Sequence, residues 1–485
     1  MAKVELTTRR RNFIVAVMLI SAFVAILNQT LLNTALPSIM RELNINESTS
    51  QWLVTGFMLV NGVMIPLTAY LMDRIKTRPL YLAAMGTFLV GSIVAAMAPN
   101  FGVLMLARVI QAMGAGVLMP LMQFTLFTLF SKEHRGFAMG LAGLVIQFAP
   151  AIGPTVTGLI IDQASWRVPF IIIVGIALVA FIFGLISISS YNEVKYTKLD
   201  KRSVMYSTIG FGLMLYAFSS AGDLGFTSPV VIGAMIISAM IISSIIIYLF
   251  IRRQFNISNA LLNLSVFKNR TFALCTISSM IIMMSMVGPA LLIPLYVQNS
   301  LALSALLSGL VIMPGAIING IMSVFTGKFY DKYGPRPLIY TGFTILTITT
   351  IMLCFLHTDT SYTYLIVVYA IRMFSVSLLM MPINTTGINS LKNEEISHGT
   401  AIMNFGRVMA GSLGTALMVT LMSFGAKIFS STSPSHLTAT EIKQQSIAIG
   451  VDISFAFVAV LVMAAYVIAL FIREPKEIES NRRKF

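Results

Sequence analysis

Three arginines stand inside long apolar stretches of the chain, where an ionisable side chain is costly. Arg108, Arg372 and Arg407 are each flanked by hydrophobic residues, and Gln111 follows Arg108 at a spacing of three, which puts both on one helix face. On insertion scales a guanidinium in a membrane span costs about 2.5 to 3.5 kcal/mol, so it should face a cavity or a partner. An arginine near a helix end can instead extend to the membrane surface, and this alternative fits Arg108 best. We predict that these four residues, together with Asp223, are the intramembrane residues that carry charge and couple transport.

Two loops share an aspartate, a following cation and a later Arg-Pro-Leu sequence. The residues are Asp73, Arg74 and Arg78 in the first copy, and Asp331, Lys332 and Arg336 in the second. Such self-similarity in a membrane chain is the mark of a duplicated fold. A carboxylate at the inner end of one helix can latch to a neighbouring helix end, so we predict that these six residues form an inner gate. The alternative is a solvated turn whose charges only set the membrane topology.

Residues 140–162 are apolar and long enough to cross a bilayer as a helix, yet Pro150 and Pro154 interrupt them. Each proline would cost a soluble helix about 3 kcal/mol, whereas in a membrane neighbouring helices can satisfy the freed carbonyls. Gly153 and Gly158 remove side chains and allow a partner helix to approach closely. We predict a pivot formed by these four residues; the alternative is a tightly packed structural helix.

The composition is that of a polytopic membrane protein. Of the 485 residues 57% are hydrophobic and only 11% charged, against about 25% charged in soluble domains. Fourteen apolar runs reach roughly the 20 residues that a bilayer requires, and the first, 13–36, is too long for a cleavable signal. Cys275 and Cys354 lie in apolar runs, so neither a disulfide framework nor a metal site is expected.

The formal charge of +15 reports topology. With the N-terminus inside, most of the 33 Lys and Arg fall in the tails and in alternate loops, the positive-inside pattern. We therefore expect a multi-pass protein of the cell membrane with both termini in the cytoplasm, in contact with anionic inner-leaflet lipid and not with nucleic acid. No motif for nucleotide hydrolysis or metal catalysis is visible, so we do not expect an enzyme.

Four of these stretches resemble motifs of the major facilitator superfamily. Residues 149–158 look like its antiporter motif gxxxGPxxGG, with Ala149 and Thr157 replacing two glycines, and residues 107–116 resemble R-x-x-Q-G-x-G. The two Asp-containing loops resemble the cytoplasmic signature of the same family. Residues 27–37 resemble the L-D-x-T-I-V-N-V-A-L-P signature of the fourteen-helix drug:proton antiporter branch, with Asn28 in place of the usual aspartate. The likeness is closest to the Lmr-type multidrug efflux pumps.

The resemblance implies an all-α membrane fold of fourteen transmembrane helices. Two pseudo-symmetric six-helix bundles would occupy residues 1–190 and 271–485, and residues 191–270 would form a linker with two inserted helices, 204–222 and 229–251. Residues 252–270 could form an amphipathic surface helix or a plain linker. We expect residues 430–450 to form the one sizeable outer loop, because they are polar and rich in Ser and Thr.

The resemblance also implies export of diverse lipophilic or amphipathic antibiotics and cations by alternating access and proton antiport. The partners would be small-molecule drugs and protons, the energy source the proton gradient without a cofactor, and the active form a monomer. A symporter, or an exporter of an endogenous metabolite or lipid, is the alternative. Methionine, phenylalanine and amide side chains would line the substrate cavity, the amides being Asn28, Asn33, Asn61, Gln147, Asn319, Asn384 and Asn404. As an alternative, Asn28 and Asn33 only form hydrogen bonds between helices.

The proton site is where the chain departs from the family it resembles. Asn28 cannot titrate, and none of the 18 Asp and Glu falls near the middle of a predicted span. We hypothesise that an outward-side carboxylate binds the proton, with Asp223 as first choice and Asp162 or Asp452 next. Otherwise coupling is weak, or cationic drugs move down the membrane potential.

Overall fold

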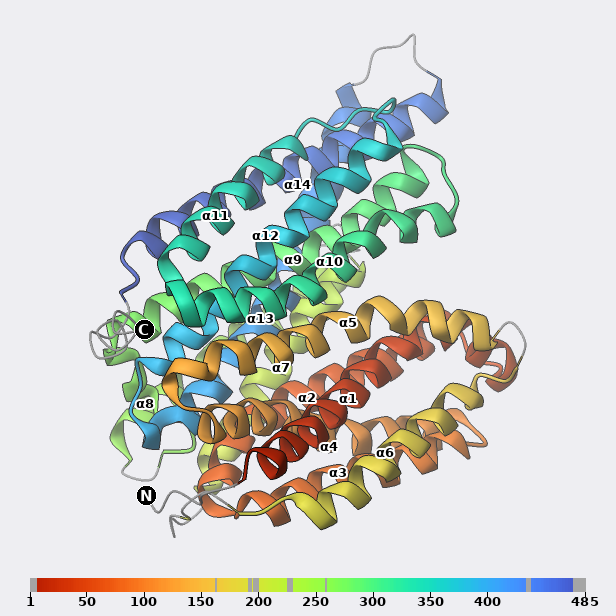
Figure 1. Cartoon of the computed structure of the whole chain (residues 1–485). Helices are drawn as coiled ribbons and strands as arrows, with labels where there is room; N and C mark the ends of the chain where they lie inside the picture. The colour runs from red at the N-terminus through yellow and green to blue at the C-terminus, as the bar shows by residue number, and fades with distance from the viewer. Residues whose placement is uncertain are drawn as a thin grey trace. The chain divides into compact units, whose positions relative to one another are not determined.

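The computed structural model describes residues 7–161, 164–190, 194, 200–224, 230–257, 260–432 and 438–473. This part of the chain is almost entirely helical (Figure 1). The first helices are α1 (Thr8–Leu43), α2 (Glu47–Arg74), α3 (Thr77–Ala96), α4 (Phe101–Leu129), α5 (Arg135–Ile161), α6 (Arg167–Ser187) and α7 (Lys201–Leu224). The others are α8 (Val230–Asn256), α9 (Arg270–Asn299), α10 (Ala305–Tyr333), α11 (Pro335–Met352), α12 (Tyr362–Asn389), α13 (Ile396–Thr432) and α14 (Ala439–Leu470).

Within the described residues, 11 helices are long and apolar enough to cross a membrane. Apolar side chains cover much of their outer surface: Ile186 of α6 is 73% exposed, and Ile241 of α8 is 57% exposed. In water such surface would be unfavourable, whereas lipid tails accept it. The exposed side chains therefore agree with the membrane class predicted from the composition.

The chain forms two compact units. Unit 1 contains residues 1–212, 245–266 and 392–405; unit 2 contains residues 213–244, 267–391 and 406–485. The helices α7, α8 and α13 are thus divided between the units. The division predicted from the sequence, into residues 1–190, 191–270 and 271–485, follows continuous segments of the chain, and it stays a prediction.

The two units share a set of internal helix contacts. In unit 1, α4 packs against α1, α2 and α3, while α6 packs against α1 and α3. In unit 2, α12 packs against α9, α10 and α11, while α14 packs against α9 and α11. Each helix pair of the first set therefore has a counterpart eight helices later in the second.

Close helix packing in unit 1 depends on positions without a side chain. A Cβ on Gly114 of α4 would lie 2.5 Å from the carbonyl oxygen of Ala84 and 2.7 Å from the amide nitrogen of Phe88, both in α3. A Cβ on Gly91 of α3 would lie 2.7 Å from the amide nitrogen of Gln111 in α4. Backbone atoms cannot yield as a flexible side chain can, so α3 and α4 lie close together only because these positions are glycine.

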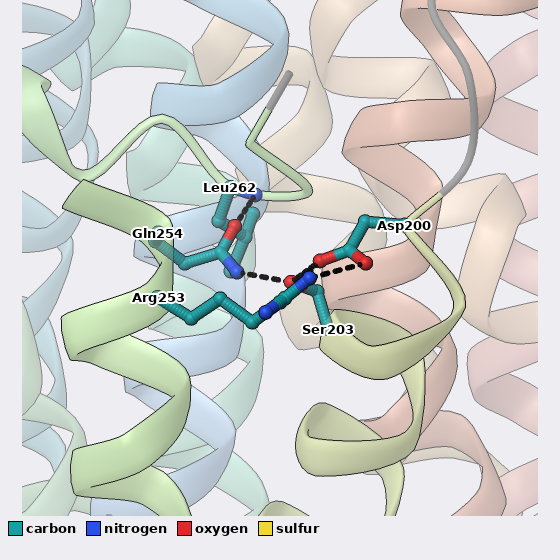
Figure 2. A network of polar contacts seen from close by, with 5 residues as sticks. All are labelled: Asp200, Ser203, Arg253, Gln254 and Leu262. Atoms are coloured by element: carbon teal, nitrogen blue, oxygen red, sulfur yellow. Dashed lines mark hydrogen bonds and ion pairs between the residues drawn. The ribbon is translucent and has the colours of Figure 1, made fainter. Parts of the chain in front are cut away.

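A polar clamp closes the base of the α7–α8 hairpin (Figure 2). Arg253 donates two hydrogen bonds to the carboxylate of Asp200, from Nε at 2.6 Å and from Nη2 at 2.9 Å. Ser203 adds its hydroxyl to the same carboxylate. The Arg253 guanidinium, with help from Ser203, holds the pKa of Asp200 well below its ordinary value, so the clamp stays ionised at any physiological pH and would be lost only on strong acidification.

One expectation about helix limits is wrong. Most of residues 430–450 are helical, because α13 continues to Thr432 and α14 begins at Ala439. Thr438 and Glu441 form a capping box that starts α14, because Thr438 Oγ1 accepts from the Glu441 amide and the Glu441 carboxylate accepts from the Thr438 amide. In addition, α1 continues through Pro37 to Leu43, beyond the apolar run 13–36. Both helices therefore include polar residues beyond the apolar runs from which their positions were predicted.

The contact at Gly114 gives a first testable prediction. Gly114→Ala should destabilise the protein by about 1 to 3 kcal/mol, since overpacking against backbone atoms outweighs the helix propensity of alanine. The control is Gly175→Ala in α6, where a Cβ would meet nothing within 4 Å. Thermal unfolding of both variants in detergent measures the difference, and equal melting temperatures for the two would contradict the packing argument.

Candidate functional site

A polar cluster lies in the interior of unit 1, where α1, α2, α3 and α4 meet. Arg108 and Gln111 of α4 are both 0% exposed. Arg108 donates from Nε to the carbonyl of Leu53 at 3.2 Å, and from Nη1 to the side-chain oxygen of Gln111 at 3.1 Å. Its guanidinium also lies over the ring of Phe57, 4.2 Å from the centroid. Arg108 therefore does not extend to the membrane surface; it is enclosed by neutral oxygens and an aromatic face.

Gln111 connects this cluster to α1 and α3. Its amide nitrogen donates to Ser92 Oγ at 3.1 Å and to Asn28 Oδ1 at 3.4 Å. Two donors remain without a hydrogen-bond partner, Arg108 Nη2 and Asn28 Nδ2. The ion pairs found among the described residues do not include Arg108. The interior of this unit thus carries a positive charge that no described carboxylate balances.

Unit 2 has a similar buried arginine. Arg372 of α12 is 0% exposed and donates through Nη2 to the carbonyl of Ser285 on α9. Its Nε and Nη1 have no hydrogen-bond partner. Since α4 contacts α1 and α12 contacts α9, the two arginines occupy corresponding helix junctions in their own units. Arg407 of α13 is also buried. Arg108 and Gln111 thus lie together in unit 1, while Arg372 and Arg407 belong to unit 2, and the role of these residues in coupling stays a prediction.

Asp73, at the end of α2, lies against the first turn of α13. Its Oδ1 accepts from the Ser397 hydroxyl at 2.6 Å, and its Oδ2 lies 3.0 Å from His398 Nε2. The N-terminus of a helix carries a partial positive charge, which also favours an anion there. The neighbouring Arg74 donates to the Tyr70 hydroxyl. The structure thus places Asp73 at a helix end as predicted, while its role in gating stays a prediction.

The other gate candidates differ in their surroundings. Arg78 holds the end of α6, since its Nη2 donates to the Leu185 carbonyl at 2.9 Å. In the second loop Asp331 is half-buried at the end of α10, Lys332 lies over the ring of Tyr333, and Arg336 is exposed in the first turn of α11. Arg78 thus contributes to packing within unit 1.

The predicted pivot in α5 packs against α1, and Gly153 is a point of close approach. Gly153 is buried, and a Cβ there would collide with Thr30 Oγ1 and lie 3.3 Å from Thr30 Cβ. Pro150 is exposed. Pro154 and Gly158 are in α5 by their backbone, but their side-chain surroundings lie outside the described residues. The α1–α5 approach at Gly153 is the described feature that a pivot would use.

The predicted cavity amides are found in several places. Asn404 donates to Gln123 Oε1 at 2.8 Å, and Asn384 accepts from Ser279 Oγ at 3.2 Å. Asn319 is buried with its Nδ2 unpaired. Asn61 and Gln147 are half-buried, and the side chain of Asn33 lies outside the described residues. Asn28, Asn384 and Asn404 therefore form hydrogen bonds between helices. For Asn28 this contact is the one that the alternative interpretation expects.

Of the candidate proton-binding carboxylates, the surroundings of Asp452 are described. Asp452 is half-buried in α14 and accepts from the Leu356 amide at 2.9 Å. Leu356, Val451 and Phe455 belong to one buried hydrophobic cluster around it. Asp162 and the side chain of Asp223, in the last turn of α7, lie outside the described residues.

Sequence reasoning missed several polar residues that the structure brings to these sites. Ser92, Gln123 and His398 each bind a predicted residue from another helix. Nothing in their own sequence surroundings distinguishes them, because a serine, a glutamine or a histidine inside an apolar run has many possible partners. A partner two helices away becomes visible only when the helices are packed.

Comparison with known proteins identifies relatives along almost the whole chain. The sequence profile of the Major Facilitator Superfamily matches residues 18–415. The uncharacterized MFS-type transporter YcnB of Bacillus subtilis is 40% identical, over 96% of both chains. The lincomycin resistance protein LmrB of Listeria monocytogenes is 37% identical over 96% of this chain and 97% of its own length.

Solved structures share the fold at low sequence identity. The human organic anion transporter MFSD10 (TETRAN) superimposes with a TM-score of 0.66 at 11% identity, over 94% of this chain and 99% of its own. The proton:xylose symporter XylE gives 0.63 at 14% identity, over 97% of both chains. At these identities the match concerns the fold alone.

The Gly153 contact gives a prediction with a built-in rescue. Gly153→Ala should lower thermal stability by about 1 to 3 kcal/mol through overpacking against Thr30. Thr30→Ala removes the colliding oxygen, so the double variant should recover most of the loss, and the two substitutions should be strongly non-additive. Melting temperatures of the four proteins measure the coupling. Additive losses would show that α5 does not approach α1 at this point.

Proposed function

We propose that this chain, which belongs to the Major Facilitator Superfamily, is a multidrug exporter that removes structurally diverse lipophilic or amphipathic antibiotics and cations from the cell. Members of this superfamily are transporters, and so the chain is a transporter and not an enzyme. The observation that carries the proposal is end-to-end similarity to proteins named for lincomycin resistance. More distant relatives at 26% identity are also named as multidrug proteins.

We further propose fourteen membrane spans arranged as two pseudo-symmetric six-helix bundles with α7 and α8 inserted between them. The repeated contact pattern of α1 to α6 and α9 to α14 supports this arrangement. The corresponding burial of Arg108 and Arg372 supports it as well. Both termini would be cytoplasmic in the cell membrane, where the basic loops contact anionic lipid. The protein would act as a monomer, without a cofactor and without nucleic acid.

Transport would follow alternating access. The glycine contacts between α3 and α4 make part of unit 1 stiff, while α5 packs along α1 and approaches it closely at Gly153, where the pivot would lie. Asp73, which contacts the first turn of α13, would act as one half of the inner gate, and Asp331 would act as the other half. Adaptable methionine and amide side chains would accept drugs of different shape.

Proton antiport would supply the energy, and it requires a titratable group other than residue 28. Asn28 is held by Gln111 and cannot bind a proton in exchange for drug. We infer that an outward-side carboxylate has this role. Asp452 supports the idea, because it combines partial burial with a single backbone donor and no ion pair among those of the described residues. Asp223, favoured by the sequence, is the competing candidate.

Export can be tested in whole cells of a pump-deficient host. Expression should reduce ethidium accumulation and raise resistance to lincomycin by about tenfold or more, as expected if a single exporter is the main route of clearance. Asp73→Asn should retain drug binding while lowering the rate of export. Increased accumulation on expression would instead identify an importer, and unchanged accumulation and resistance across a drug panel would favour an endogenous metabolite or lipid.

Proton coupling can be tested in proteoliposomes under an imposed pH gradient. If Asp452 binds the proton, Asp452→Asn should lose the gradient-driven component while keeping drug exchange across the membrane; if Asp223 does so, Asp223→Asn should behave in this way. Asp359→Asn is the control, because Asp359 is exposed in the same outer region of the sequence. Full gradient-driven transport by both test variants would contradict the inference, and a wild type insensitive to the gradient would contradict antiport itself.

A further inference from the structure

A chain of polar contacts connects the end of α2 with the base of the α7–α8 hairpin, passing through the first turn of α13. All its members belong to unit 1. In order they are Asp73, His398, Asn263, Leu262, Gln254, Ser203, Asp200 and Arg253, with Ser397 as a second contact of Asp73. We call this chain the inner relay. It links the predicted gate residue to the two helices that lie outside the repeated six-helix pattern.

The hydrogen bonds of His398 define its protonation form. The backbone N–H of Asn263 donates to His398 Nδ1 at 3.2 Å, so Nδ1 must be an acceptor. A neutral imidazole then carries its proton on Nε2, which lies 3.0 Å from Asp73 Oδ2 and donates to it. His398 is 8% exposed, so water does not compete freely for these contacts. The geometry therefore requires neutral His398 with the proton on Nε2.

The next contacts join this histidine to the hairpin. Leu262, the neighbour of Asn263, donates its amide to Gln254 Oε1 at 3.1 Å, and Gln254 donates through Nε2 to Ser203 Oγ at 2.7 Å (Figure 2). Ser203 belongs to the clamp formed with Asp200 and Arg253. Leu262 is only 2% exposed and anchors the segment in the interior. A displacement of α7 or α8 would therefore be transmitted to Asn263, and from there to His398.

The charged groups on the segments next to His398 mostly have partners of their own. On α2, Asp73 is its direct partner and Arg74 bonds to Tyr70. In the turn before α13, Glu395 accepts from the Lys392 amide, while Glu394 is exposed. At the hairpin base Asp200 and Arg253 form an ion pair with each other. Asp73 is thus the group that responds most directly to a proton on His398.

We propose that His398 is a positioning residue that orients the gate carboxylate of Asp73 and couples it to the α7–α8 hairpin, and that protonation of His398 from the cytoplasm breaks this coupling. The inference rests on the proposed export function and adds regulation to its gate. A second ring proton on Nδ1 removes the acceptor of the Asn263 amide. At the same time the charged ring and the Asp73 carboxylate become an ion pair, which is stronger than the hydrogen bond from the neutral ring. Acid on the cytoplasmic side therefore tightens the latch, releases the hairpin and slows the exporter, which limits proton entry when the cytoplasm is already acidic.

Ethidium transport in proteoliposomes tests the regulation. The pH on the cytoplasmic side is set to about 6 or about 8, on either side of the ordinary histidine pKa, with the transmembrane gradient held constant. Wild-type turnover should fall by about tenfold at the lower pH, the scale of one charge-assisted hydrogen bond. His398→Gln should turn over within about twofold of wild type at the higher pH and lose this fall, because glutamine offers one acceptor and one donor but cannot be charged.

The matched control is His134→Gln. His134 is an exposed histidine in the short turn before α5, also in unit 1, and its Nδ1 pairs only locally with Ser131. This variant should keep the wild-type pH response. A pH response of His398→Gln equal to that of wild type would overturn the proposal, as would loss of the response in His134→Gln with its retention in His398→Gln.

Hydrogen–deuterium exchange tests the relay without any substrate. At one fixed pH, His398→Leu should raise the exchange rate of a peptide covering residues 260–266 by about tenfold, since the Asn263 amide loses its acceptor. His398→Gln should leave this rate near that of wild type. Unchanged exchange in His398→Leu would overturn the relay. If exchange behaves as expected but wild type transports no ethidium, the export function fails while the contact between His398 and the hairpin segment stands.

Discussion

The packing of unit 1 depends on the contacts that stabilise the buried guanidinium of Arg108. Arg108 sits in the interior of its unit with no described carboxylate beside it, and it is held by backbone and amide oxygens and by the face of Phe57. The oxygens belong to Asn28 in α1, Leu53 in α2 and Gln111 in α4, so these three helices must keep one arrangement for the charge to remain solvated by the protein. The packing of these helices supplies the oxygens that stabilise the Arg108 guanidinium. A change in that packing would leave the charge without these partners.

Asn28 shows how one substitution changes this balance. In the antiporter signature that residues 27–37 resemble, an aspartate stands here and could offset the charge of Arg108. Asn28 supplies only neutral oxygens: its carbonyl lies 3.4 Å from Arg108 Nη1, and its side chain accepts from Gln111. Because an amide cannot exchange protons, the proposed antiport would use groups elsewhere, such as Asp452 or Asp223. The local chemistry of α1 thus shapes what the rest of the transporter must do.

The polar contacts at the helix ends have a different physical basis. Near the membrane surface, side chains can ionise at little cost, and the free amides at a helix start attract anions. Asp73 at the start of α13 and Asp200 at the start of α7 both use this property. Glycine contacts between helices supply the rigidity in between, since α3 and α4 approach to distances that no Cβ would permit. Under the proposed alternating access, rigid interiors and ionic helix ends would let helices move as bodies with defined contacts at their ends.

The sequence by itself determined the class of protein, the helical membrane fold and the superfamily, because hydrophobic length, charge distribution and short motifs are local properties of the chain. It also identified Arg108, Gln111, Gly153 and Asp73 as special, since a charge, a glycine or a proline in an apolar run is visible without a structure. It misjudged residues 430–450, where a capping box extends α14 beyond the apolar core. Only the tertiary structure decided which groups meet: Gln111 with Ser92, Asn404 with Gln123, and Asp73 with His398. These partners are up to hundreds of positions apart in the chain, and their contacts follow from helix packing, which side-chain volumes across many helices determine together and no local pattern records.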